Sequence, residues 1–155
     1  MLHTLTSQVG LILLILVCAL VIAKGGTAER LGGAMVAITW GGNLAVQAIT
    51  GQVIPQASIM VSDALLATGF LVLAIRYASV WLGAGMIFQA AAFALHSFQL
   101  NQELGSNRLY MASVNVLSYC VLATVGGGAF MSWRKRRKAA RARAEAEAGG
   151  LPHPV

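Results

Sequence analysis

Charged residues are scarce in this chain, and their scarcity excludes most classes of soluble protein. Only 10% of the 155 residues are Asp, Glu, Lys or Arg, whereas 57% are hydrophobic. Soluble globular domains carry about 25% charged residues. Lipid is therefore the expected solvent for most of the chain, and the length leaves no room for a separate aqueous domain.

Motifs for catalysis, metal binding and disulfide formation are also missing. Cys18 and Cys120 lie within apolar runs, which is typical of small core residues. The sequence has no His-x-Glu or paired-Cys spacing, no phosphate-binding glycine loop and no Ser, His and Asp set. His3 and His153 belong to opposite ends of the chain, so neither can join His96 in holding a haem. We predict no metal, no cofactor and no catalytic residue.

Five apolar runs are long enough to cross a bilayer as helices. A helix rises 1.5 Å per residue, so a hydrocarbon core of about 30 Å needs about 20 apolar residues. We predict an all-α integral membrane bundle of five transmembrane helices in residues 1–133, followed by a basic tail in residues 134–155. The predicted spans are 5–23, 31–49, 57–75, 78–100 and 109–132.

The weakest boundary between these spans lies at Arg76 and Tyr77. One charge and an interfacial aromatic interrupt an otherwise continuous apolar run there. A single helix over 57–100 would be about 66 Å long and would not fit one bilayer. The sequence therefore predicts a tight turn at this point.

Lysine and arginine are distributed unevenly between the loops. With the amino terminus outside, ten of the eleven lie inside and only Arg108 lies outside, as the positive-inside rule requires. Tyr110 and Trp133 are then expected at the outer and inner interfaces as aromatic anchors. The predicted location is the cell inner (cytoplasmic) membrane, multi-pass, with the tail in the cytoplasm.

The tail begins with a basic cluster and continues in strong helix formers. Ala, Arg and Glu residues predict that the fifth helix extends to Ala148, with disorder expected over 151–155. Basic residues at a membrane surface attract anionic lipid by about 1 kcal/mol each. No aromatic residue interleaves them, which argues against nucleic acid. Anionic lipid, and a protein partner or second copy, are the predicted partners of Arg134, Lys135, Arg136, Arg137 and Lys138.

Polar side chains gather at one depth in the outer half of the predicted bundle. Asn43, Asp63 and Asn115 each lie six residues from the outer end of their spans, or about 9 Å below the interface. Gln47 and His96 lie closer to it. We predict a polar chamber lined by these five side chains that binds a small ligand or ion, with no comparable set in the inner half.

Asp63 is the most informative of these residues. A carboxylate inside a membrane costs several kcal/mol unless it is paired, hydrated or protonated. His96 is the ionisable side chain predicted at similar depth, and an imidazolium would stabilise the carboxylate. The pair can carry protons, bind a cation or hold helices together, and the amides can serve as interhelical glue alone.

Small residues in the second span, Gly33, Ala37 and Gly41, are spaced for close helix approach. Their stripe predicts a packing surface within the bundle or between copies.

A non-enzymatic membrane subunit or sensor fits these features best. Its outer polar chamber would bind the ligand or ion. The alternative is a small oligomeric proton- or cation-coupled transporter that uses Asp63. That alternative needs polar residues in the inner half, where Thr39, Thr68 and Thr124 are weak candidates. A membrane enzyme acting on a lipid is the third hypothesis.

Overall fold

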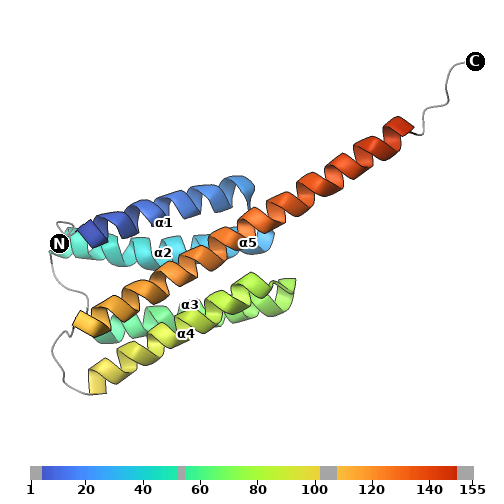
Figure 1. Ribbon diagram of the computed structural model, residues 1–155. Helices are drawn as coiled ribbons and strands as arrows, with labels where there is room; N and C mark the ends of the chain where they lie inside the picture. Colours follow the sequence, from blue (N-terminus) through green and yellow to red (C-terminus); the bar gives the residue numbers. More distant parts are fainter. Residues whose placement is uncertain (1–4, 52–54, 102–107, 150–155) are drawn as a thin grey trace, which may run out of the picture.

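The described residues are helical almost throughout, as the sequence predicts. The computed structural model describes residues 5–51, 55–101 and 108–149, and within them it contains five helices and no strand. Figure 1 shows consecutive helices running antiparallel, with the last one extending well beyond the others. The helices are α1 (Leu5–Lys24), α2 (Thr27–Thr50), α3 (Gln56–Tyr77), α4 (Val80–Asn101) and α5 (Arg108–Gly149).

The bundle has two distinct ends. At the amino-terminal end, α1, α3 and α5 begin and α2 and α4 finish. At the tail end, α1 and α3 finish, α2 and α4 begin, and α5 passes through on its way out (Figure 1). The most extensive packing joins α3 to α4 and α4 to α5, while α5 also contacts α1, and α2 lies between α1 and α3.

The tight turn predicted between the third and fourth apolar runs is present. α3 ends where Ala78 adopts the left-handed conformation, with φ 48°, which is uncommon for a residue with a Cβ. The N–H groups of Ala78 and Ser79 both donate to the Ala74 carbonyl, so this helix end is satisfied. α4 begins at Val80, and the apolar run over 57–100 is therefore two helices.

Apolar side chains cover the outside of the bundle as well as its core. Phe70, Leu82 and Val121 are completely buried, whereas Ile38 and Ile75 are each 74% exposed. By length and composition, α3, α4 and α5 can each cross a membrane, and the part of α1 from residue 9 onward is a shorter apolar helix. Exposed apolar surface of this extent indicates a lipid or protein environment. The protein is a helical bundle with three helices able to span a membrane.

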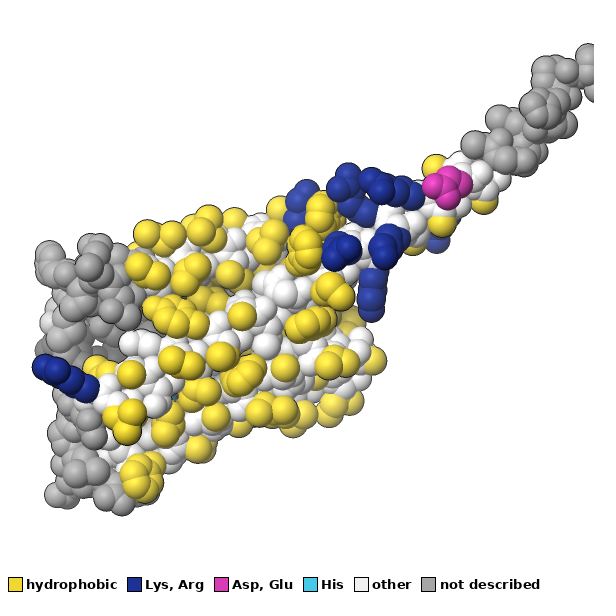
Figure 2. Space-filling view, viewed as in Figure 1, with side chains coloured by type: hydrophobic (Ala, Val, Ile, Leu, Met, Phe, Trp, Pro, Cys, Tyr) yellow, Lys and Arg dark blue, Asp and Glu magenta, His cyan; other side chains and the backbone are white. Residues whose placement is uncertain are grey.

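α5 continues past the bundle, as the helix-forming residues of the tail predict. It ends at Gly149, and the predicted disorder of 151–155 lies outside the described residues. Figure 2 shows Lys and Arg side chains gathered where α5 leaves the bundle. Lys24 Nζ of α1 lies 5.1 Å from the ring centre of Trp133 on α5, a cation–π contact that joins the two helices at the tail end.

The glycine stripe predicted in the second span is only partly a packing surface. A Cβ added at Gly33 would lie 2.8 Å from Val21 Cγ1, so α1 and α2 approach closely there. A Cβ added at Gly41, eight residues further along α2, would meet no described atom within 4 Å. A contact within the bundle is therefore present at Gly33, whereas Gly41 faces open space, and a contact between copies at Gly41 stays a prediction.

Candidate functional site

Asp63 of α3 is a buried carboxylate in the amino-terminal half of the bundle. It lies seven residues after Gln56, the first residue of the helix, or about 10 Å along the axis. Asp63 is 7% exposed, and Gln89 of α4 is 2% exposed. The Gln89 side-chain amide donates to Asp63 Oδ1 at 2.6 Å. One carboxylate oxygen is therefore held by a neutral donor from the neighbouring helix.

The other carboxylate oxygen faces His96. His96 follows Gln89 by seven residues on α4, so both project from one face of that helix. His96 Nε2 lies 3.3 Å from Asp63 Oδ2, which is the distance of an ion pair. Oδ2 is nevertheless buried and accepts no hydrogen bond from the described residues. The pair is close in space, and this oxygen has no aligned donor.

Gln56 and Tyr110 extend this arrangement toward the amino-terminal end. Gln56 Nε2 lies 2.7 Å from His96 Nδ1 and 2.7 Å from the Tyr110 hydroxyl. That hydroxyl lies 2.5 Å from the same ring nitrogen. Gln56 begins α3 and Tyr110 is the third residue of α5. The side chains of Gln56, Asp63, Gln89, His96 and Tyr110 thus form one connected set, which we call the Asp63 cluster.

The groups around His96 suit two protonation states of its ring. When the Gln56 amide donates to Nδ1, that nitrogen is unprotonated and Nε2 carries the hydrogen toward Asp63. When both nitrogens are protonated, the Tyr110 oxygen can accept from Nδ1 while the imidazolium faces the carboxylate. The cluster can therefore hold a proton on either side of the Asp63 and His96 contact without moving a helix.

The structure brings together two of the five side chains predicted to line a chamber, Asp63 and His96. Asn43 and Gln47 are half-buried on α2, and no hydrogen bond joins their side chains to the Asp63 cluster within the described residues. Asn115 is exposed on α5. Helix rise fixes how deep a side chain lies, but helix rotation decides which way it faces.

Three members of the Asp63 cluster were not among the predicted site residues. The sequence predicts a loop at Gln56, an interfacial anchor at Tyr110 and a position near the midplane for Gln89. The spacing of seven between Gln89 and His96 is the signal that connects one of them to the pair. Gln56 and Tyr110 meet because α3 and α5 both pack against α4, and no pattern in one helix reveals this arrangement.

The donor set of the cluster suits a proton better than a metal ion. In the described residues, no group of three His, Cys, Asp or Glu side chains is placed to hold a metal. Asp63 and His96 supply two strong ligands, whereas zinc sites use three or four from the protein.

The predicted lipid-binding residues 134–138 are all exposed on α5. Three of these residues also make contacts within the described part of the chain. Arg136 donates to the Lys24 carbonyl. The Arg134 guanidinium lies 5.8 Å from the Phe130 ring centre, and that of Arg137 lies 4.9 Å from the Trp133 ring centre. The basic cluster therefore combines an exposed polar surface with one contact to α1 and two contacts within α5.

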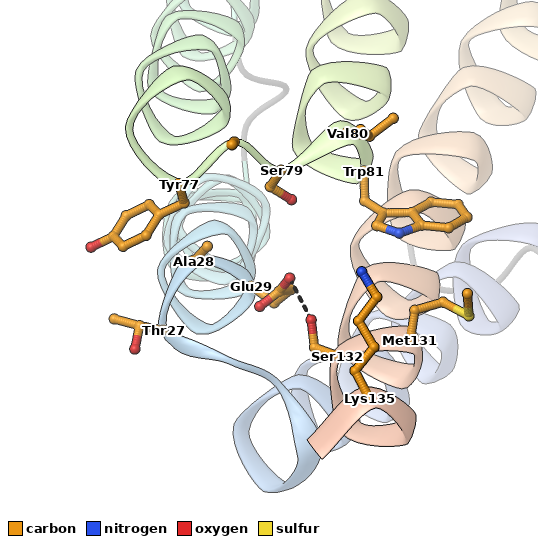
Figure 3. A pocket seen from close by; sticks show the side chains of 11 residues that line it. Thr27, Ala28, Glu29, Tyr77, Ser79, Val80, Trp81, Met131, Ser132 and Lys135 are labelled. Carbon is orange, nitrogen blue, oxygen red and sulfur yellow. Dashed lines mark hydrogen bonds between the residues drawn. The ribbon is translucent and has the colours of Figure 1, made fainter. Parts of the chain in front are cut away.

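The tail end holds a second buried carboxylate, which the sequence analysis missed. The sequence predicts a loop at Glu29, but this residue belongs to the first turn of α2 and is 7% exposed. The Ser132 hydroxyl donates to Glu29 Oε1 at 2.8 Å. Both residues line a cavity of about 380 Å³ (Figure 3). This pair lies at the end of the bundle, where α2 begins, and not at the depth of the Asp63 cluster.

Comparison of the chain with protein-family models, curated proteins and solved structures gives no match. The interpretation of both sites thus depends on their own geometry.

Proposed function

We propose that all five helices cross the membrane, with the amino-terminal end outside and the tail end in the cytoplasm. α1 has 20 residues and α2 has 24, which is the length that a bilayer core requires. Ile22 of α1 is 69% exposed and Ile49 of α2 is 84% exposed, so both helices present apolar side chains outward. This supports contact with lipid around the whole bundle.

The distribution of basic residues supports the proposed orientation. Lys24, Arg30 and Arg76 lie at the tail end together with the basic cluster of α5, whereas Arg108 begins α5 at the opposite end. Short cytoplasmic loops carry the excess of Lys and Arg in membrane proteins. A fluorescent protein fused after residue 155 is expected to mature in the cytoplasm, and alkaline phosphatase at the same site is expected to be inactive. The reverse pattern would contradict the orientation.

Within this topology, we propose that the protein is a non-enzymatic membrane subunit or sensor whose outer half binds a proton at Asp63 and His96. The observation that carries the proposal is the buried Asp63 Oδ2, which lies 3.3 Å from His96 Nε2 and accepts no hydrogen bond from the described part of the chain. A buried carboxylate in this state gains stability from a proton on itself or on the adjacent imidazole. In such a pair, the protonation of the carboxyl group depends on the protonation of the imidazole, so the two groups titrate as a unit.

A sensor is favoured over a transporter because the core beneath the cluster is apolar. Leu66, Phe70 and Leu73 follow Asp63 along α3, and all three are buried. Val121 and Val125 of α5 are at most 1% exposed. A proton can reach Asp63 from the amino-terminal end through Gln56, Tyr110 and His96, but the described core offers no comparable polar series toward the tail end. This favours binding and release on one side over conduction.

Infrared difference spectroscopy tests the proposal directly. Full-length protein in nanodiscs would be recorded across a pH step between 8 and 5, which spans the unperturbed titration of histidine and approaches that of carboxyl groups, about 6.5 and 4. We expect imidazole and carboxyl bands that change together. Asp63→Asn should remove the carboxyl change, and His96→Gln should shift it, because the two groups are in contact. Glu29→Gln, which alters the other buried carboxylate, is the matched control and should leave these bands in place.

An identical difference spectrum for Asp63→Asn would overturn the proposal. Measurement of proton flux in proteoliposomes distinguishes the proposed sensor from the alternative transporter. We expect no proton current above that of empty vesicles, and a current that Asp63→Asn abolishes would establish transport instead.

A further inference from the structure

The cavity at the tail end has the size of a small-molecule site. Its volume is about 380 Å³, within the range of about 300–1,000 Å³ for ligand pockets. The start of α2, the turn between α3 and α4, and the point where α5 leaves the bundle enclose it (Figure 3). Its polar and aromatic lining includes Glu29, Tyr77, Ser79, Trp81, Ser132 and Lys135.

Glu29 is a buried carboxylate in this lining without a cationic partner. In the described part of the chain, the ion pair within 4.0 Å is that of Asp63 and His96. Glu29 accepts one hydrogen bond, from Ser132. Glu29 Oε2 and the Arg136 guanidinium both lie beside Gly26 but form no ion pair, so a cation that enters the cavity would stabilise the carboxylate further.

Lys135 supplies the opposite charge to the same cavity. Its neighbours on α5 are engaged: Arg134 with Phe130, Arg136 with the Lys24 carbonyl, and Arg137 with Trp133. Lys135 makes no such contact with the described residues. In Figure 3 its side chain rises from α5 beside Ser132, with the nitrogen directed toward Trp81. The cavity therefore presents an unengaged ammonium and a buried carboxylate to one occupant.

We propose that this cavity binds the head group of phosphatidylethanolamine, in which a phosphate is joined to a primary ammonium. Lys135 would hold the phosphate, and Glu29 would accept hydrogen bonds from the ammonium. Tyr77 and Trp81 border the cavity and are 40% exposed each, as expected of aromatics at the level of lipid head groups. The proposal rests on the membrane orientation proposed above, which places this end at the cytoplasmic leaflet.

The charged side chains that line the cavity favour phosphatidylethanolamine over two other common phospholipids. Phosphatidylglycerol brings a phosphate but no cation for Glu29. Phosphatidylcholine brings a cation without N–H donors, so it forms no hydrogen bond with the carboxylate. We therefore expect a preference for the primary ammonium.

Native mass spectrometry of the full-length protein in mild detergent tests this preference. Phosphatidylethanolamine, phosphatidylglycerol and phosphatidylcholine would be titrated separately, and the lipid-bound fraction measured. For Lys135→Ala and Glu29→Gln we expect about tenfold weaker retention of phosphatidylethanolamine, the loss of one charge-assisted hydrogen bond. Arg143→Ala is the matched control, because Arg143 is exposed on the same helix but lies outside this cavity and outside residues 134–138. Lys135 is exposed, so its replacement leaves the folded bundle intact.

Free ethanolamine phosphate, titrated up to 10 mM, tests whether the bound lipid is held through its head group. Displacement of bound lipid by this compound in the wild type, and not in Lys135→Ala, would support the head-group site. Equal retention of phosphatidylethanolamine by Lys135→Ala and Arg143→Ala would overturn the proposal. So would a loss of phosphatidylglycerol in Glu29→Gln as large as the loss of phosphatidylethanolamine, because phosphatidylglycerol brings no cation for Glu29. Neither result would affect the infrared changes assigned to Asp63 and His96. The lipid site and the proton site can therefore each be contradicted without the other.

Discussion

Among the described residues, each end of the bundle buries one carboxylate, and the two are satisfied in different ways. At the amino-terminal end, Asp63 meets Gln89 and His96, both of which lie on α4 and are almost completely buried. At the tail end, Glu29 meets Ser132 and otherwise borders a cavity. Asp63 is therefore held by side chains of the neighbouring helix, whereas Glu29 has a cavity beside it.

This difference bears on what each end can bind. A carboxylate packed against an imidazole can exchange a proton with little rearrangement. A carboxylate beside a cavity, with an unengaged lysine nearby, can accept a larger zwitterionic occupant. The same residue type therefore supports two roles, and the surrounding packing distinguishes them.

The largest expected effect is the loss of His96. His96→Leu leaves the Asp63 carboxylate buried without its partner, and breaking a buried pair in this way costs about 3–5 kcal/mol. The free energy of unfolding, measured by titration with sodium dodecyl sulfate and followed by circular dichroism, should fall by about 3 kcal/mol.

The double variant Asp63→Leu with His96→Leu is the control for that measurement. Two apolar residues of similar volume replace a buried pair at little cost, so most of the stability should return. A double variant as unstable as His96→Leu alone would mean that packing, and not charge, explains the loss.

Removal of the Gln89 amide should have the next largest effect. Gln89→Leu leaves Asp63 Oδ1 without the hydrogen bond that it accepts at 2.6 Å, and an unsatisfied buried charged group costs about 2 kcal/mol. Asn115→Ala is the control, since Asn115 is exposed and its loss should change stability by less than about 0.5 kcal/mol. Equal effects from the two variants would place Asn115 inside the bundle.

Glycine substitutions compare the two halves of α2. Gly33→Ala should destabilise the protein by about 1 kcal/mol, because the new Cβ meets Val21. Gly41→Ala has open space and should stabilise the helix by about 0.5–1 kcal/mol. The same unfolding titration measures both, and a loss of stability for Gly41→Ala would indicate a contact with another copy of the chain.

The smallest effect is expected at the tail end. Ser132→Ala removes the hydrogen bond to Glu29, but water in the adjacent cavity can replace it, so the loss should be about 0.5 kcal/mol. A loss as large as that of Gln89→Leu would show that Glu29 is as isolated from water as Asp63 is, and the contrast between the ends would disappear.

The sequence alone determined the helices and much of their placement. Continuous apolar runs and the polar breaks between them predict five helices, and the observed boundaries differ from the predicted spans by a few residues. The extension of α5 beyond its span was predicted from the helix formers of the tail. The depth of Asp63 and His96 followed from helix rise, and the two side chains are in contact. Such features are local, because each depends on the residues of one helix.

Tertiary packing decided which polar groups meet. Gln56 and Tyr110 reach His96 because the start of α3 lies beside the start of α5, while Asn115 of that same helix faces outward. Glu29 became a buried cavity residue only because α5 passes over the start of α2. The rotation of each helix about its axis depends on all its neighbours at once, and no spacing within a single helix contains that information.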